Sequence, residues 1–325
     1  MWPKQSVSDV SRHTIVAVLV LALLALAGLT VGTYTIYLLN LAMIAVIAAI
    51  GLNLLTGNTG QISLSHSSFM AIGAYVSALL TARYGVPFWV AIPTAATVAA
   101  VIGGCLGLPA SRLQGIYLAL ATLGFLQIVQ IVIEEFADIT GGVRGMSVPK
   151  PSWLGGAPLT EYGAFLVVSV ACVFAVWSAT NILASAYGRE MNAVRLSPHA
   201  AQALGVAVAR VKLGAFALSA AYAGVAGGLL AMVVGFIDPI EFGVSAALRQ
   251  ITYIVVGGMG SVAGSVIGAV VLSGLPEVLR PVREYSDVIY TLILLAFLLF
   301  MPHGLVTVWY ALRRRLQRTL TPARQ

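Results

Sequence analysis

Residues 13–82 read HTIVAVLVLALLALAGLTVGTYTIYLLNLAMIAVIAAIGLNLLTGNTGQISLSHSSFMAIGAYVSALLTA and contain no Asp, Glu, Lys or Arg. A helix needs roughly 20 mostly apolar residues to cross the hydrocarbon core of a bilayer. The uncharged stretch between Arg12 and Arg83 therefore has room for three membrane spans.

Seven further spans fit between later charged residues. One each is predicted between Arg83 and Arg112, Arg112 and Glu134, Glu161 and Arg189, Lys212 and Asp238, and Asp287 and Arg313, with two short ones between Glu241 and Glu277. Only 9% of the 325 residues are charged, against about 25% in soluble domains. Backbone amides in lipid must be bonded within their own segment, and these runs do not alternate as barrel strands do. The sequence predicts an all-α polytopic membrane protein with about ten transmembrane helices.

The charged residues also predict an orientation. Twelve of the 18 basic residues fall on one side of a ten-span topology: Lys4, Arg12, Arg112, Arg189, Arg195, Arg210, Lys212, Arg313, Arg314, Arg315, Arg318 and Arg324. Only Asp9 and Glu190 are acidic there. The positive-inside rule makes this side cytoplasmic, together with both termini.

This topology divides the chain into a cytoplasmic N-terminus (1–13), a transmembrane domain (14–306) and a basic cytoplasmic tail (307–325), with a cytoplasmic segment at 187–210. The apolar run at 14–24 imitates a signal peptide. Because apolar sequence continues beyond it, we expect an uncleaved first span.

The first polar interruption is GNTGQISLSHSS at residues 57–68. Glycines can end the preceding helix there, and Ser63, Ser65 or Ser67 can cap the next one. A helix start at membrane depth would aim amide donors at a carboxylate, whereas the alternative is an ordinary loop at the cytoplasmic surface. For His66 we favour a neutral imidazole bonded between helices over a proton-coupling site.

Two further interruptions stand out. GGMGSVAGS at 257–265 lies six spans after the first, which indicates either a parallel internal repeat or close packing of small residues. The cytoplasmic segment at 187–205 predicts two short helices, of which the second is capped by Ser197, opened by Pro198 and ended by Gly205.

Polar residues within the spans are few. Gln127, Gln130 and Glu134 share one helix face, and we favour hydrogen bonds between helices for the glutamines. Arg249 is expected near the outer surface, paired with Asp238 or Glu241. Neither cysteine has the close Cys or His partners of a metal or redox site, so no metal is predicted.

Several of these stretches resemble the LivM-type permeases of high-affinity branched-chain amino acid importers. They are GLNLLTG (51–57), TGQISLSH (59–66), GAY (73–75), GIYLALATL (115–123), TGG (140–142), 188–212 and GGMGS (257–261). The resemblance implies an ATP-binding-cassette importer permease fold in the bacterial inner membrane. It also implies a heterodimer with a second permease, two cytoplasmic ATPase subunits and a periplasmic binding protein.

In such importers a coupling helix with the pattern Glu-Ala-Ala, three residues, Gly contacts the ATPase, and the corresponding stretch here is HAAQALG at 199–205. His199 replaces the glutamate. The expected coupling residues are Arg189, Arg195, His199, Ala200, Ala201 and Gly205. The expected translocation path includes Asn53, Gln61, Ser65, His66, Gln127, Gly257 and Gly258.

The chain has no Gly-x-x-x-x-Gly-Lys-Ser/Thr loop, so we expect no cofactor on it, no enzyme activity, and ATP only on partner subunits. Related permeases for urea, short amides or aromatic acids are the alternatives for the cargo. An ion-coupled secondary transporter is a rival class, although few intramembrane carboxylates could carry the ion. An intramembrane enzyme would need paired carboxylates, a metal cluster or a Ser-His pair, which the spans lack.

Overall fold

The computed structural model describes residues 28, 31–151, 159–279, 292, 295, 304 and 305, and eight of the ten predicted spans are helices in it. They are α2 (Thr33–Leu52), α3 (His66–Tyr84), α4 (Phe88–Ala110), α5 (Ile116–Glu135), α7 (Glu161–Ala184), α10 (Val208–Val234), α11 (Val244–Gly257) and α12 (Val262–Val278). The all-α fold is therefore confirmed. The predicted first span, most of the last span and the tail at 307–325 lie outside the described residues.

Five of these helices are long and apolar enough to cross a membrane: α2 with its π-helical extension η1 (Asn53–Gly57), α4, α5, α7 and α10. The helices α11 and α12 are shorter, at 14 and 17 residues, as predicted for the segment between Glu241 and Glu277. Helix α3 begins in the polar sequence of the first interruption.

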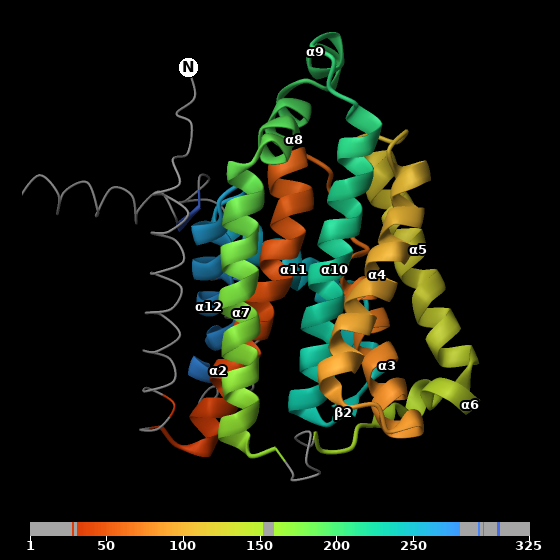
Figure 1. The fold of residues 1–325 in the computed structure, drawn as a ribbon, viewed down its shortest axis with the longest axis vertical. Coiled ribbons are helices and arrows are strands. Elements are labelled where there is room, and N and C mark those ends of the chain that lie inside the picture. Colours follow the sequence, from red (N-terminus) through yellow and green to blue (C-terminus); the bar gives the residue numbers. More distant parts are fainter. Residues whose placement is uncertain are drawn as a thin grey trace, which may run out of the picture.

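The short elements divide between the two ends of the bundle (Figure 1). Helices α8 (Ala186–Leu196) and α9 (Pro198–Ala203) lie at one end, which we call the α8 end. The opposite end, the α6 end, carries α6 (Ala137–Thr140), η2 (Gly142–Arg144), β1 (Met146–Ser147), β2 (Phe236–Ile237) and η3 (Pro239–Phe242). The two strands pair antiparallel, with Met146 opposite Ile237.

Charge follows this division. Among the described acidic residues, only Glu190 lies at the α8 end, and the others lie at or near the ends of elements that meet at the α6 end. The loops therefore alternate between the two ends as the positive-inside argument requires.

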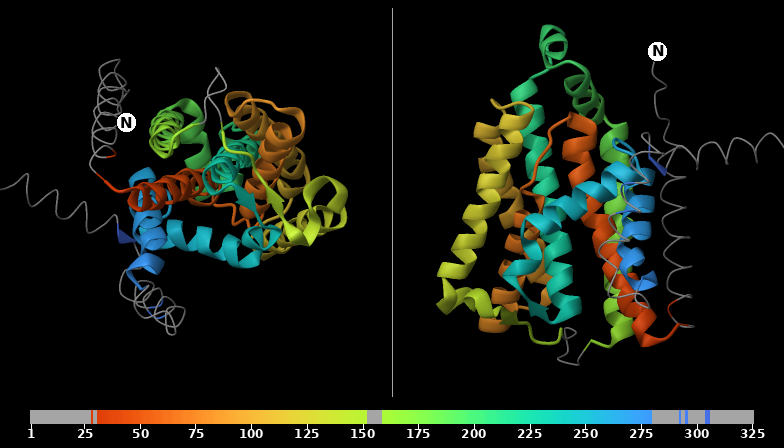
Figure 2. Two further views of the ribbon diagram at one scale, coloured as in Figure 1. Left: turned by 90° about the horizontal axis from the view of Figure 1, so that it is seen from below. Right: turned by 180° about the vertical axis from the view of Figure 1, so that it is seen from behind.

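Helix α10 is the centre of the packing and is flanked by α4, α3 and α2 (Figure 2). Small residues allow the backbones to approach closely, as is common between membrane helices. A Cβ on Gly73 of α3 would stand 2.3 Å from the carbonyl oxygen of Gly224 on α10. A Cβ on Gly103 of α4 would stand 2.4 Å from the Cβ of Ala220 on α10. Glycine is therefore required at both contacts.

Helices α2 and α5 occupy opposite kinds of position. Of the residues in the most apolar part of the α2 path (Thr33–Gly57), 72% are buried inside the protein. In the most apolar part of α5, only 22% of the residues are buried. Helix α5 packs mainly on α3 and on the turns η2 and η3. Its outer surface must therefore face lipid or another protein.

The two short helices predicted at 187–205 are present as α8 and α9. The hydroxyl of Ser197 accepts a 3.3 Å hydrogen bond from the amide of Ala200, and Pro198 occupies the first turn of α9. Gly205 follows with φ +86°, a left-handed conformation that glycine adopts without strain.

Candidate translocation site

The first polar interruption is an extended segment that enters the bundle. The helical path from Thr33 ends at Gly60, which has φ +73°, and the chain reaches α3 only at His66. Between them Gln61, Ser63 and Ser65 are buried, whereas Ile62 is 51% exposed. This alternation is that of a strand with one face in the protein, so the interpretation as an ordinary surface loop is wrong.

Helix α3 starts deep in the bundle. The Nδ1 atom of His66, its first residue, lies 3.0 Å from the hydroxyl of Ser219. Ser219 is eleven residues into α10 from Val208, which is about 16 Å along the helix axis. The start of α3 therefore lies well inside the bundle and not at its end. The contact is the interhelical hydrogen bond favoured for His66.

The predicted cap of α3 is wrong. Ser65 occupies the capping position, but its side chain accepts no bond from the first turn. The backbone of Ser65 is already helical, with φ −79° and ψ −1°, and its hydroxyl lies 2.8 Å from that of Ser63. The buried hydroxyls of Ser67 and Ser68 find no partner among the described residues. Irregular backbone at this depth is tolerated only inside protein or beside a water-filled cavity.

All three polar interruptions meet at the α8 end of the bundle. The side-chain oxygen of Asn53 accepts a 2.8 Å hydrogen bond from the amide of Gly260, and the amide of Asn58 donates to the carbonyl of Gly260 at 3.4 Å. The Nη1 atom of Arg195, on α8, donates a 2.6 Å bond to the carbonyl of Gly57. These residues join segments that lie more than 130 positions apart in the sequence.

The junction depends on close backbone approach. Residues Asn53–Gly57 form a π-helical turn, a feature that often marks functional sites. A Cβ on Gly57 would stand 1.9 Å from the side-chain oxygen of Asn53 and 2.5 Å from the amide of Gly260. One on Gly260 would stand 2.5 Å from Nη1 of Arg195. We call Asn53, Gly57, Asn58, Arg195 and Gly260 the junction.

The segment expected to contact an ATPase projects beyond the bundle (Figure 1). His199, Ala200 and Gly205 are exposed there, whereas Ala201 is only 2% exposed and packs inside the chain. Two apolar side chains not predicted for this role, Leu196 and Leu204, are 85% and 84% exposed.

The two arginines predicted for this segment bond within the chain. The Nη1 atom of Arg189 donates to the carbonyl of Ala184, five residues earlier. Arg195 belongs to the junction, so its observed contact is with Gly57 of the first interruption.

The predicted hydrogen bonds of the α5 glutamines are not found. Gln127 is exposed and Gln130 lies beside Gly243, and neither side chain bonds to another described residue. Arg249 forms no ion pair within contact distance of a described acidic residue, but its charge lowers the pKa of Glu241, so its predicted pairing is found with Glu241 only as a longer-range interaction.

The sequence was compared with known proteins. Residues 34–298 match the family described as "Branched-chain amino acid transport system / permease component". The chain belongs to this permease family. No solved structure matches the chain significantly.

Curated relatives of this permease include two proteins named high-affinity branched-chain amino acid transport system permease protein LivM. Those of Salmonella typhimurium and Escherichia coli are each 35% identical over 281 residues, covering 79% of this chain and 66% of the relative. The LivH permease protein of Escherichia coli is 28% identical, covering 79% of this chain and 89% of the relative. The chain thus spans slightly less than two thirds of the length of the LivM proteins.

Within the permease, six of the predicted path residues fall into two groups and Gln127 lies apart from both. Asn53 and Gly257 lie at or next to the junction, and Gly258 has φ +123° in the turn that leads to Gly260. Gln61, Ser65 and His66 follow the extended segment into the bundle, whereas Gln127 lies on the exposed face of α5. The role of Arg195 in joining the interruptions was missed because no local pattern relates it to Gly57.

Proposed function

We propose that this chain is the membrane permease subunit of an ATP-binding-cassette importer for branched-chain amino acids in the bacterial inner membrane. The names of the LivM and LivH relatives support the substrate class and a second permease as partner. The two ATPases and the periplasmic binding protein belong to the proposal, as does a cytoplasmic location of the α8 end.

One observation carries the proposed mechanism. Exposed Leu196 and Leu204 flank a projecting helix, and the same segment reaches the start of the first interruption through Arg195. A partner that moves α8 and α9 would therefore move the junction. Because the extended segment follows directly at Gly60, that movement would open or close the path beside it.

The given sequence contains no nucleotide-binding loop, and the proposal assigns the energy source to separate subunits that hydrolyse ATP. The chain contributes the path and the mechanical link. Among the described residues no cluster of His, Cys, Asp or Glu could hold a metal ion.

The test is reconstitution of the complete complex in liposomes. Leucine-loaded binding protein should raise ATP hydrolysis and leucine uptake more than urea-loaded binding protein. Equal stimulation by both, or a larger effect of urea, would contradict the proposed cargo. Ion-driven uptake by the chain without ATPase subunits would instead favour a secondary transporter.

A further inference from the structure

A cavity of about 480 Å³ lies between α2, α11, α12 and η3. Small-molecule sites commonly measure about 300–1,000 Å³ and combine apolar walls with a few polar groups. The cavity has that composition. Its polar lining is Glu241, Arg249, Gln250, Tyr253 and Ser273, and the buried parts of its apolar lining include Ile44, Ala48, Met70, Phe242 and Leu272.

The two charged side chains of the cavity, Glu241 and Arg249, form no hydrogen bond or ion pair with a described residue. Burial raises the pKa of the Glu241 carboxyl, the charge of Asp238 raises it further, and the charge of Arg249 lowers it. Glu241 and Arg249 thus interact electrostatically without forming a contacting ion pair. Gln250 is only 7% exposed, and its amide donates to the sulfur of Met70 at 3.4 Å while its Oε1 atom has no described partner.

Polarity is graded along the cavity. Glu241 and Arg249 are exposed near the α6 end, whereas the apolar wall formed by Ile44, Ala48 and Leu272 is at most 2% exposed. Helix α11 crosses the back of the bundle, as Figure 2 shows from behind. A ligand entering from the α6 end would meet the two charges first and the apolar wall beyond them.

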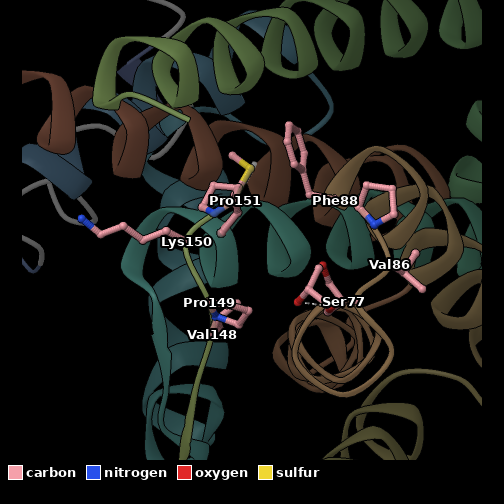
Figure 3. Close-up of a pocket in the computed structure, with 11 residues that line it drawn as sticks. Ser77, Val86, Phe88, Val148, Pro149, Lys150 and Pro151 are labelled. Carbon is pink, nitrogen blue, oxygen red and sulfur yellow. Dashed lines mark hydrogen bonds between the residues drawn. The ribbon is translucent and has the colours of Figure 1, made fainter. Parts of the chain in front are cut away.

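Other hollows of the described structure suit such a ligand less well. A cavity of about 210 Å³ at the α6 end is lined by Ser77, Phe88, Lys150 and prolines, and Lys150 extends away from Ser77 (Figure 3). It contains no carboxylate to pair with an ammonium group. The start of α3 is sealed, because Ser65 and Ser67 are fully buried.

We propose that the 480 Å³ cavity binds the zwitterion of an aliphatic α-amino acid, with Arg249 holding its carboxylate, Glu241 its ammonium group and the apolar wall its side chain. Gln250 supplies a further acceptor for the ammonium group. This assignment rests on the proposed function, since it names the residues that would receive the cargo. Glu241 and Arg249 have no contacting ion-pair partner among the described residues, and a zwitterion would supply an opposite charge to each.

The test measures equilibrium binding of radiolabelled leucine to the purified complete complex without nucleotide or binding protein. Competitors are leucinamide, which lacks the carboxylate, and 4-methylpentanoate, which lacks the ammonium group. Arg249→Gln should remove the preference for leucine over leucinamide, and Glu241→Gln the preference for leucine over 4-methylpentanoate. Each change should weaken leucine binding on the order of tenfold, as for loss of a charge-assisted contact.

Arg144→Gln and Glu135→Gln serve as matched controls, because these exposed charges lie near the α6 end and do not line the cavity. They should bind leucine as the wild type does. Unchanged competitor preferences in both cavity variants, or no leucine binding by the wild type, would overturn the assignment. If the wild type binds leucine with these preferences but shows no ATP-driven uptake, the site stands and the proposed function fails.

Discussion

The guanidinium of Arg195 donates a 2.6 Å hydrogen bond to the carbonyl of Gly57, although the two residues are 138 positions apart. Gly260 packs against the same guanidinium, and its amide bonds to Asn53. One side chain of the projecting segment thus contacts the end of the α2 path and the turn before α12. This arrangement provides a direct physical route from α8 to the interior break.

Loss of the Arg195 side chain should loosen the end of the α2 path. In Arg195→Ala, amide hydrogen exchange at residues 57–62 should be faster than in the wild type, because the carbonyl of Gly57 loses its partner. Arg189→Ala is the matched control, since Arg189 bonds only to the nearby carbonyl of Ala184. Equal exchange at residues 57–62 in the two variants would count against the link.

A side chain at Gly57 should disrupt the junction. Gly57→Ala places a Cβ within 2.5 Å of the Gly260 amide, and overpacking of this kind costs typically about 1–3 kcal/mol. Gly124→Ala is the control, because no heavy atom lies within 4 Å of its added Cβ. Thermal unfolding in detergent should show a lower midpoint for Gly57→Ala alone. Unfolding of that variant at the wild-type midpoint would be incompatible with the junction geometry.

Ser67, near the start of α3, should respond to substitution differently from Ser219 on α10. Ser67→Ala removes a buried hydroxyl without a described partner, so the free energy of unfolding should stay the same or rise. Ser219→Ala removes the hydrogen-bond partner of His66 and should lower it by about 1 kcal/mol. The comparison requires reversible unfolding in detergent. A larger loss of stability in Ser67→Ala than in Ser219→Ala would contradict this packing of the break.

Contact with the ATPases should depend on exposed residues of the segment. Leu204→Asp replaces an 84% exposed apolar side chain, so it should reduce capture of the ATPase subunits while leaving the folded permease intact. Ala201→Leu should instead destabilise the permease itself, because Ala201 is buried. Copurification and thermal unfolding distinguish these effects. If Leu204→Asp captured the ATPase subunits as the wild type does, Leu204 would not be part of the contact surface.

The sequence predicts the helices well, because span length and the placement of charges depend on the membrane rather than on particular neighbours. Eight spans, which include the short pair around Gly258, and the two helices at 186–203 all appear as expected. The position of the first interruption was also evident from its glycines and serines. Its extended path into the bundle was one of two alternatives that the sequence left open.

Contacts between distant segments could not be predicted in the same way. Nothing local relates Arg195 to Gly57, and a six-residue helix such as α9 gives too little periodicity to show that Ala201 faces inward. Ser65 does not cap α3, because its hydroxyl bonds with the hydroxyl of neighbouring Ser63 instead. These outcomes depend on tertiary packing, which overrides local preference.

In the proposed mechanism α8 and α9 act on the interior break through Arg195. The number of leucine molecules imported per ATP hydrolysed by the complete complex in liposomes, compared between Arg195→Ala and the wild type, tests this link. Arg195→Ala should continue to hydrolyse ATP while its import per ATP falls on the order of tenfold. A wild-type ratio in Arg195→Ala would contradict a link between α8 and the break.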